Sequence, residues 1–300
     1  MKEIIAQAQA LGIAYEESVP MSAKTSFRIG GAAELMLFPA TPGQLSDCIR
    51  LCMEQGEKPF ILGNGSNLLV KDSGLDGVVI STEKLQRIAV LGCDGDGFVF
   101  CEAGVRLSEL CVFAQKQGLS GLEFAYGIPG SAGGAVYMNA GAYGGEMKDV
   151  LESVDYVDTQ GELCELPEHA LDLGYRHSVF MRNGGVVADL TVHLTPGDPA
   201  EIRAKMNETM QKRKDKQPLD YPSAGSVFKR PEGHFAGALI EQCGLKGQGV
   251  GGARVSEKHA GFIVNAGGAT AADVRALIAV VQTVVENETG VFLEPEIRFV

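Results

Sequence analysis

The sequence predicts a mixed α and β fold with two or three compact domains. Short apolar runs typical of strands alternate with amphipathic helical stretches, and no long repeat or low-complexity segment interrupts them. The chain has 300 residues, 45% of them hydrophobic, which is enough to bury a full core. Pro196, Gly197 and Pro199 then interrupt the alternation. We therefore predict a domain boundary near these residues.

Before this boundary, the clearest helix is predicted at residues 43–56. Leu45, Cys48, Ile49 and Cys52 recur there at helical spacing, and Gly56 suits a helix C-cap. A second helix is predicted at residues 107–118, also ending at a glycine. Strands are predicted at residues 59–62, 98–103 and 186–194.

Beyond the boundary, two helices and a final strand are predicted. Residues 201–216 form a charged helical pattern, and residues 270–290 form a longer one. Thr270 and Asp273 stand near the start of the longer pattern, where such residues cap helices, and Gly290 stands at its end. The last strand is predicted at residues 296–300.

Two glycine-rich segments indicate ligand binding. Residues 126–145, YGIPGSAGGAVYMNAGAYGG, contain seven glycines and no charged side chain. Glycine allows close approach of the backbone, whose N–H groups then suit a phosphate. A turn followed by a tightly packed small-residue helix is the structural alternative. Residues 63–68, GNGSNL, form a second such loop after a predicted strand, but neither segment has the GxGxxG pattern of a Rossmann fold.

The charge and hydropathy of the chain exclude several classes of partner. A formal net charge of −12 argues against a general nucleic-acid or anionic-membrane surface, so a bound phosphate must meet a local positive pocket. No run of about 18 apolar residues occurs, which predicts no membrane insertion. We expect a cytoplasmic protein, and nothing in the sequence indicates an oligomer, so a monomer is favoured.

The cysteines and histidines do not form a recognisable metal or redox motif. No CxxC or HExxH pattern occurs, so we predict reduced thiols and no structural metal. Cys48 and Cys52, four residues apart in a predicted helix, are expected to be two buried small hydrophobic residues. The seven cysteines are Cys48, Cys52, Cys93, Cys101, Cys111, Cys164 and Cys243.

Motifs along nearly the whole chain resemble one enzyme family. ILGNGSNLLV at 61–70 and GLEFAYGIPGSAGGAVYMNAGAYGGEM at 121–147 are similar to the flavin-binding half of the UDP-N-acetylenolpyruvoylglucosamine reductase (MurB) family. The most specific motifs are SAGSVFKRP at 223–231 and LEPEIR at 293–298. Three further motifs also occur in the order found in the family, namely TSFRIGG at 25–31, YRHS at 175–178 and EKHAGFIVN at 257–265.

The resemblance implies an α+β protein with a two-part FAD-binding domain of the vanillyl-alcohol-oxidase/PCMH type. This domain would occupy residues 1–197, with a core of two subdomains at about 27–195. A C-terminal domain at 198–300 would bind the UDP-sugar substrate. The implied activity is that of a UDP-N-acetylmuramate dehydrogenase in peptidoglycan precursor synthesis. NADPH would reduce FAD, and the enolpyruvyl ether of UDP-N-acetylglucosamine would then be reduced at C3.

The family positions imply three catalytic residues. Ser226 would donate a proton to C2, Arg176 would hold the substrate carboxylate, and Glu296, in its protonated form, would complete the enolate site. The structural alternatives are a serine packed in a turn, an arginine in a surface ion pair and a solvated glutamate on an edge strand.

The resemblance also implies which residues would bind FAD and the UDP-sugar substrate. No histidine or cysteine lies in the two glycine-rich segments, so FAD would be held non-covalently. The UDP portion and carboxylate would meet Tyr175, Lys216, Arg230 and His259. The implied FAD-binding residues are Arg28, Gly63, Asn64, Gly65, Ser66, Asn67, Leu68, Ile128, Pro129, Gly130, Ser131, Gly133, Gly134, Asn139, Ala140 and Gly141.

In one respect the chain differs from the longer members of the family and resembles a shorter branch. Only MRNGG separates YRHSVF from the strand predicted at Val186, which leaves no room for the inserted loop whose tyrosine closes over substrate in the longer branch.

Two other functions stay open. A different FAD-dependent oxidoreductase of this fold need not keep Ser226 and Glu296, and a non-catalytic flavin-binding module would not be bleached by NADPH.

Overall fold

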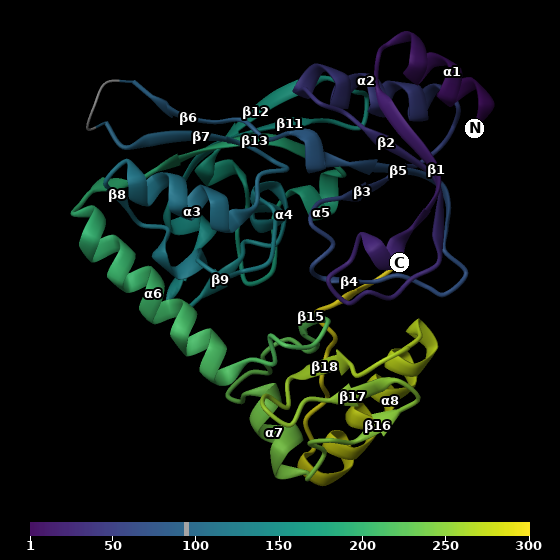
Figure 1. Ribbon diagram of the computed structural model, residues 1–300, viewed down its shortest axis with the longest axis vertical. Helices are drawn as coiled ribbons and strands as arrows, with labels where there is room; N and C mark the ends of the chain where they lie inside the picture. Colours follow the sequence, from purple (N-terminus) through teal and green to yellow (C-terminus); the bar gives the residue numbers. More distant parts are fainter. Residues whose placement is uncertain (93–95) are drawn as a thin grey trace. The chain divides into compact units, whose positions relative to one another are not determined.

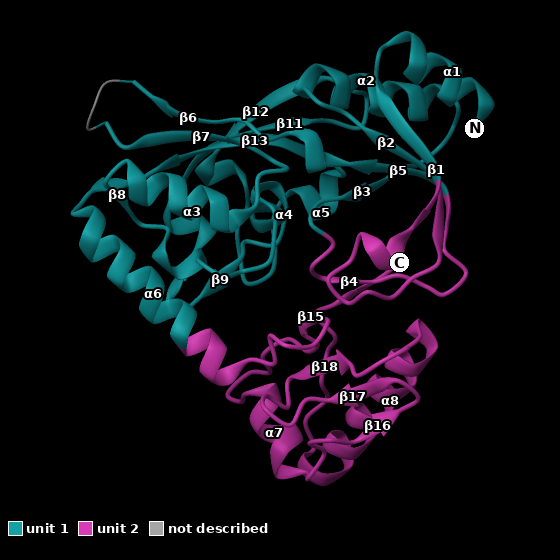
Figure 2. Ribbon diagram, viewed as in Figure 1, with its two compact units in different colours: residues 1–17, 35–64, 77–211 teal, residues 18–34, 65–76, 212–300 magenta. Residues whose placement is uncertain are grey.

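The chain folds into interspersed helices and strands, and this confirms the predicted α and β content (Figure 1). The structure is a computed structural model, and it describes residues 1–92 and 96–300. Contacts divide the chain into two units, each made of three separate stretches (Figure 2). Unit 1 comprises residues 1–17, 35–64 and 77–211, and unit 2 comprises residues 18–34, 65–76 and 212–300. The predicted division at residue 197 stays a prediction.

A four-stranded sheet in the order β1-β2-β5-β3 lies mainly in unit 1. The predicted helix at 43–56 is confirmed as α2, which begins one residue earlier because Pro42 suits the first helical position and the Thr41 hydroxyl accepts from Gln44 N at 3.1 Å. The elements of this part are α1 (Lys2–Ala10), β1 (Ala14–Pro20), β2 (Ala32–Phe38), α2 (Pro42–Glu54), β3 (Phe60–Leu62) and β5 (Leu75–Ser81).

The second sheet of unit 1 is antiparallel, in the order β12-β11-β13-β7-β6. Strand β13 is central, and α4 packs against it. The strands predicted at 98–103 and 186–194 and the helix predicted at 107–118 are confirmed as β7, β13 and α3. The bounds are β6 (Ile88–Leu91), β7 (Phe98–Glu102), α3 (Leu107–Lys116), α4 (Ala132–Tyr137), β11 (Leu151–Val157), β12 (Leu163–Pro167) and β13 (Val186–His193).

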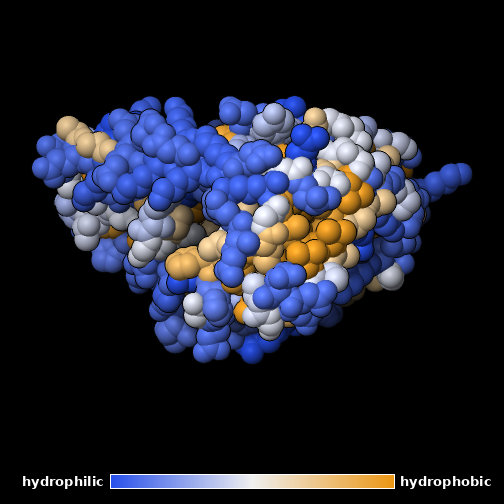
Figure 3. Space-filling model, turned by 90° about the horizontal axis from the view of Figure 1, so that it is seen from below, coloured by the Kyte–Doolittle hydropathy of each residue, from blue (hydrophilic) through white to orange (hydrophobic). Residues whose placement is uncertain are grey.

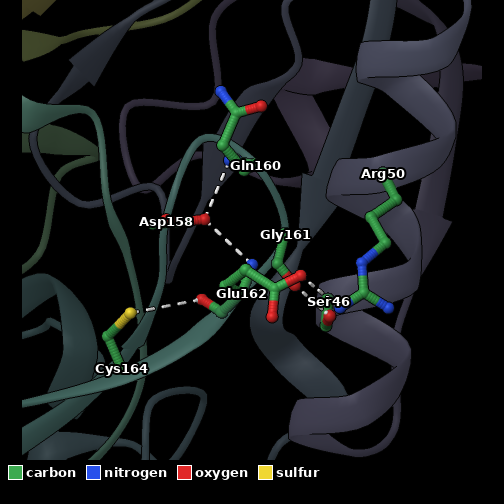
Figure 4. Close-up of polar contacts among 7 residues, drawn as sticks. All are labelled: Ser46, Arg50, Asp158, Gln160, Gly161, Glu162 and Cys164. Atoms are coloured by element: carbon green, nitrogen blue, oxygen red, sulfur yellow. Dashed lines mark hydrogen bonds and ion pairs between the residues drawn. The ribbon is translucent and has the colours of Figure 1, made fainter.

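Helix α2 is tied to the turn between β11 and β12 by polar contacts (Figure 4). The Arg50 guanidinium lies 3.1 Å from the Glu162 carboxylate, and the Ser46 hydroxyl donates to the Gly161 carbonyl. Asp158 shapes the turn by accepting from Glu162 N at 2.9 Å. Gly161 has φ +81, and a Cβ there would lie 2.3 Å from Arg50 Cγ. The turn therefore requires glycine at this position.

Three carboxyl groups stand side by side across the second sheet. Asp189 on β13 is opposite Asp155 on β11 and Glu102 on β7. Only 6% of Asp189 is exposed. Burial, followed by repulsion from Asp155 and a hydrogen bond to it, raises the pKa of Asp189 to about 7. Arg87 opposes this shift. Asp189 therefore keeps its proton up to about neutral pH, with Asp155 as its hydrogen-bond partner.

Unit 2 is built on a four-stranded sheet in the order β15-β18-β17-β16, with α8 packed against β16 and β17 and α7 packed against α8. Helix α8 confirms the helix predicted at 270–290. Thr270 and Asp273 form a capping box, and Gly290 ends the helix with φ +73. The bounds are β4 (Leu68–Leu69), β15 (Ser223–Ser226), α7 (Ala236–Gln242), β16 (Gly249–Val250), β17 (Ala253–Val255), β18 (Phe262–Asn265), α8 (Ala271–Thr289) and β19 (Arg298–Phe299).

The remaining elements include α6, the helix predicted at 201–216. It begins earlier, at Pro199, because proline suits a first turn and Asp198 Oδ1 accepts from Ala200 N at 2.8 Å. The predicted final strand at 296–300 is shorter in the structure and covers only β19. The other bounds are β8 (Leu119–Ser120), β9 (Gly141–Ala142), β10 (Gly145–Glu146), α5 (Phe180–Asn183), β14 (Thr195–Pro196) and α6 (Pro199–Lys216).

The six described cysteines are free thiols, and Cys93 lies outside the described residues. Cys48 and Cys52 are fully buried, as predicted, and burial raises the pKa of Cys52 to about 12. On the face drawn in Figure 3, hydrophobic residues gather near the centre, with hydrophilic residues around them. In the described part of the chain, no helix is long and apolar enough to cross a membrane.

Candidate active site

Within unit 1, the structure brings Gly63 and Asn64, the start of one glycine-rich segment, next to the other segment. The Asn64 amide donates to the Pro129 carbonyl at 2.6 Å. A Cβ built at Gly63 would lie only 2.6 Å from Ser131 Oγ. A side chain at residue 63 would therefore fill the space that now separates the two segments. Their bare backbones form the kind of surface that suits a diphosphate.

The second segment is fixed to the chain that follows β7. Leu107 N donates to the Gly130 carbonyl at 2.9 Å, and Ala132 N donates to the Val105 carbonyl at 2.8 Å. Ser131 then caps α4 by accepting from Gly134 N at 3.3 Å. A Cβ at Gly133 would lie 2.7 Å from the Ala103 Cβ, so this glycine permits the close packing. The run is thus both a close-packed helix and a candidate binding loop.

Arg28 and residues 65–68, which the resemblance also assigns to the flavin site, lie in unit 2. Gly65 has φ +60, and a Cβ there would lie 2.1 Å from the Lys24 carbonyl oxygen. Arg28 also has a positive φ of 56 and donates from its backbone N to the Thr25 carbonyl at 3.1 Å. Ser66 and Asn67 continue the loop into β4, which starts at Leu68 and pairs in parallel with β19.

Ser226 and Glu296 are brought together in unit 2. Ser226 ends β15, opposite Phe262, where the pairing with β18 is irregular. The next residue, Val227, accepts at its carbonyl from Glu296 N at 2.7 Å. Phe228 and Pro295 form an antiparallel bridge beside this contact. Two residues 70 positions apart in the sequence are therefore held at neighbouring positions of the backbone, and both are half-buried.

Arg176 lies at the tip of a tight turn in unit 1. Gly174 and His177 exchange two backbone hydrogen bonds, each 3.1 Å long, so Tyr175 and Arg176 are the two central residues. Arg176 has φ +54, a region that side-chain-bearing residues seldom adopt. Its guanidinium carbon lies 5.2 Å from the centre of the exposed Tyr175 ring. Strain retained at an arginine is typical of a functional position.

Asn139 is buried beside this turn, with 1% of its surface exposed. Its amide nitrogen donates to Glu146 Oε2 at 2.6 Å and to the Gly174 carbonyl at 3.0 Å, while its amide oxygen accepts from Lys148 N at 3.0 Å. The implied flavin contact of Asn139 stays a prediction, and its side-chain amide is already engaged with protein groups. Of the other implied positions, Ala140 N donates to the Ala135 carbonyl at 2.8 Å, Gly141 starts β9, and Ile128 packs at the edge of the core.

The implied substrate residues of unit 2 include one half-buried imidazole. His259 Nδ1 accepts from Gly261 N at 3.1 Å, which leaves the other ring nitrogen as the one that carries hydrogen in the neutral form. Burial lowers the pKa of His259 below 6.5. Arg230 lies over the ring of the exposed Phe235, 4.1 Å from its centre. Lys216 is the last residue of α6 and is exposed.

The predicted catalytic set is therefore divided between the units. Ser226, Glu296 and the substrate candidates Lys216, Arg230 and His259 belong to unit 2, whereas Tyr175 and Arg176 belong to unit 1. The connection after YRHS is short, as predicted: α5 ends at Asn183 and is capped by Gly184, with φ +72, and β13 begins at Val186. Among the described residues, no group of three or more potential ligand side chains could hold a metal ion.

Sequence reasoning missed several supporting residues that lie inside the motifs. The Ser178 hydroxyl, fully buried, donates to the Tyr137 carbonyl at 2.7 Å. The Ser26 hydroxyl donates to the Ser223 carbonyl at 2.7 Å, and the Asn265 amide donates to the Phe27 carbonyl at 3.3 Å. A small polar residue next to a candidate catalytic or binding position was the available signal, because such residues satisfy nearby carbonyls.

Two family models match the chain. One, described as an FAD binding domain, matches residues 33–167. The other, described as the C-terminal domain of UDP-N-acetylenolpyruvoylglucosamine reductase, matches residues 217–300.

Relatives in sequence cover nearly the whole chain. A UDP-N-acetylenolpyruvoylglucosamine reductase of Clostridium perfringens is 48% identical over 94% of this chain and 91% of its own length. The enzyme of that name from Clostridium novyi is 47% identical over 95% of this chain and 92% of its own length.

Solved structures agree in fold. The crystal structure of UDP-N-acetylenolpyruvylglucosamine reductase from Thermus caldophilus matches with a TM-score of 0.80 and 35% identity, over 96% of this chain and 98% of that one. A glucooligosaccharide oxidase from Acremonium strictum shares only the fold, with a TM-score of 0.52 and 14% identity over 98% of this chain and 60% of its own. With matches of this identity and coverage, the chain belongs to the UDP-N-acetylenolpyruvoylglucosamine reductase family.

Proposed function

We propose that this flavoenzyme uses NADPH to reduce the enolpyruvyl ether of UDP-N-acetylglucosamine, giving UDP-N-acetylmuramate for peptidoglycan precursor synthesis. The observation that carries the proposal is that the backbone of Glu296 is held next to the residue after Ser226, because Glu296 N donates to the Val227 carbonyl at 2.7 Å. The relatives bear the name of this reductase and cover nearly the whole chain. FAD is the cofactor that the matched binding domain implies.

The glycine-rich segments fit FAD. Gly63 and Asn64 would hold its diphosphate together with Pro129 to Gly134, because a side chain at residue 63 would fill the space against Ser131. Gly65 to Leu68 and Arg28 would contribute from unit 2. When bound, FAD supplies hydride transfer from NADPH to C3 of the enolpyruvyl group. The segments carry no histidine or cysteine, so the attachment is non-covalent.

The protein's own residues deal with the charge and the proton. Hydride addition at C3 leaves negative charge at C2 and on the adjoining carboxylate. Arg176 binds that carboxylate, since a planar guanidinium can hold two oxygens at once. Ser226 donates a proton to C2, which a hydroxyl can do only when it is positioned in advance beside a strongly basic carbon. Glu296 completes the site by donating a hydrogen bond in its protonated form.

The UDP portion needs local positive charge, because the chain carries a net charge of −12. Lys216 and Arg230 supply it from unit 2, with Tyr175 contributing from unit 1. His259 is half-buried and desolvation lowers its pKa, so it is neutral and would bind as a hydrogen-bond donor. We further propose that the enzyme acts in the cytoplasm, because NADPH and UDP-linked sugars are cytoplasmic metabolites. We propose that it is a monomer, because nothing in the sequence indicates an oligomer. Light scattering during size-exclusion chromatography checks the monomer.

Anaerobic stopped-flow absorbance tests the function. NADPH should bleach the flavin, and the UDP-linked enolpyruvate should restore its colour. In Ser226→Ala, bleaching should continue nearly unchanged while recovery slows by about 10²–10⁴-fold, the usual contribution of a general acid. Ser223→Ala, on the same strand, is the matched control and should recover normally. Normal recovery in Ser226→Ala would refute the role of Ser226.

The same experiment separates the two other functions. A different oxidoreductase of this fold would be bleached by NADPH but not recover with the UDP-linked enolpyruvate. A flavin-binding module without catalysis would stay yellow with NADPH. Bleaching and recovery together exclude both.

A further inference from the structure

The turn that carries Arg176 is held by one residue of the glycine-rich run. We call residues Gly174 to His177 the arginine turn. The Gly174 carbonyl accepts from His177 N at 3.1 Å, inside the turn, and from the Asn139 side chain at 3.0 Å. Both acceptor positions of this oxygen are thus occupied. The second bond ties the arginine turn to a residue 35 positions earlier in the sequence.

Asn139 is itself rigidly held. Its amide oxygen accepts from Lys148 N at 3.0 Å, and its second amide hydrogen goes to Glu146 Oε2 at 2.6 Å. Lys148 Nζ in turn lies 2.7 Å from Glu146 Oε1. The residue is 1% exposed and has φ +41, a conformation that asparagine tolerates better than most side chains. An amide with every polar atom paired inside the protein acts as a structural clamp.

The Asn139 side chain holds the strained backbone of the arginine turn in place. Arg176 has φ +54 in the second central position of a two-residue turn, where glycine or asparagine is usual. Such strain persists only when the surroundings hold it. A second bond does so from the other end, because the buried Ser178 hydroxyl donates to the Tyr137 carbonyl at 2.7 Å. Tyr137 and Asn139 both lie at the end of α4, whose first residues are in the proposed flavin-binding segment.

We propose that Asn139 is a positioning residue for Arg176, holding the arginine turn at the end of the proposed flavin-binding segment so that the guanidinium meets the substrate carboxylate. This rests on the proposed carboxylate-binding role of Arg176. The side chain of Asn139 acts through Arg176 and does not bind the flavin. Its place between the flavin segment and the arginine turn explains why an asparagine, and not another glycine, stands within so glycine-rich a run.

Two substitutions test the side-chain hydrogen bonds of Asn139 separately from its backbone conformation. Asn139→Gly keeps the positive φ available and removes the amide, whereas Asn139→Asp keeps the shape and replaces both donor hydrogens by a carboxylate oxygen facing the Gly174 carbonyl and Glu146. Asn207→Asp, on the exposed surface of α6, makes the same change of charge elsewhere in unit 1. FAD content, the visible absorption spectrum, substrate binding to the oxidised enzyme and both half-reactions are measured for each.

If the proposal is right, FAD content and spectrum stay unchanged and bleaching by NADPH stays within about threefold. Reoxidation by the UDP-linked enolpyruvate slows by about 10–100-fold, the cost of misplacing a positioning group by roughly 1 Å, and binding of that substrate weakens. The double variant Asn139→Gly/Arg176→Ala is no slower than Arg176→Ala alone, because the clamp has nothing left to position. Asn207→Asp behaves as the unchanged protein.

Other results overturn the proposal in distinguishable ways. If Arg176→Ala reoxidises normally, the proposed role of Arg176 fails and the clamp fails with it. If Arg176→Ala is slow but the Asn139 variants are normal, or if their effects add fully in the double variant, only the clamp is wrong. Loss of FAD from the Asn139 variants with normal reoxidation of the remaining holoenzyme makes Asn139 a flavin ligand instead.

Discussion

The Asn67 side chain donates a hydrogen bond to the backbone carbonyl of Glu296, with 3.2 Å between Nδ2 and O. The Asn67 carbonyl accepts in return from Arg298 N at 2.9 Å. The resemblance gives Asn67 to the flavin loop, and the structure shows that it also braces the backbone of the proposed catalytic glutamate. The loop and the end of the chain therefore form one connected element of unit 2.

Removing this brace should loosen Glu296. In Asn67→Ala we expect recovery of the reduced flavin by the UDP-linked enolpyruvate to slow by about fivefold, since one hydrogen bond contributes about 1 kcal/mol. Stopped-flow absorbance measures the rate. Asn287→Ala, exposed on α8, is the control. Unchanged recovery with reduced FAD content would mean that Asn67 serves the flavin alone.

A methyl group at residue 63 should weaken flavin retention. The new Cβ would lie 2.6 Å from Ser131 Oγ, so either the Ser131 hydroxyl must turn away from its cap on Gly134 N or the two glycine-rich segments must move apart. We expect Gly63→Ala to lose FAD during gel filtration, which the ratio of flavin absorbance to protein absorbance reports. Gly43→Ala is the control, because its new Cβ meets no atom closer than 3.8 Å, in the first turn of α2. Equal FAD retention in both variants would contradict the proposed cradle.

The capping box of α8 should stabilise unit 2. Thr270 Oγ1 accepts from Asp273 N at 3.0 Å, and Asp273 accepts from Thr270 N at 3.0 Å. Thr270→Ala should lower the free energy of unfolding by about 1 kcal/mol, the usual cost of losing such a cap. Urea unfolding followed by circular dichroism measures it. Thr283→Ala, in the exposed middle of the same helix, should have no cost, because alanine favours helix interiors.

Asp189 should make stability fall as pH rises towards neutrality. Its pKa is raised from 3.8 to about 7, mainly by burial, so the folded protein binds a proton that the unfolded chain has released. Stability therefore decreases from about pH 4 to about pH 7 and levels off above. Asp189→Asn should flatten this slope and raise the melting temperature at pH 8 by a few degrees, as measured by calorimetry. Glu152→Gln, exposed on β11, should keep the slope.

Local sequence signals predicted those elements that local interactions determine. The helix at 270–290 was predicted from Thr270, Asp273 and Gly290, and all three take the predicted cap positions. The strand predicted at 296–300 was too long. Glu296 N bonds to Val227, on a different part of the chain, so only Arg298 and Phe299 pair with β4.

The sequence identified the residues of the candidate site but not the hydrogen bonds that hold them in place. The motifs gave Arg176, Ser226 and Glu296, but the braces on two of them involve partners far away in sequence. Asn67 and Glu296 are 229 residues apart, and Asn139 and Gly174 are 35 apart. Side-chain hydrogen bonds to distant carbonyls leave no periodic pattern, so sequence placed both asparagines only among the flavin residues. The conformation of Arg176, with φ +54, was equally invisible.

The interleaved path of the chain limits how this protein can be cut and recombined. The apolar core of unit 2 includes Phe27, Ile29 and Leu69, all at most 3% exposed, together with residues that follow position 223. A fragment that starts at residue 212 would lack these three side chains and the strand that pairs with β19. It would expose apolar surface and is expected to aggregate. A chimaera that exchanges the C-terminal part between relatives must therefore exchange residues 18–34 and 65–76 as well.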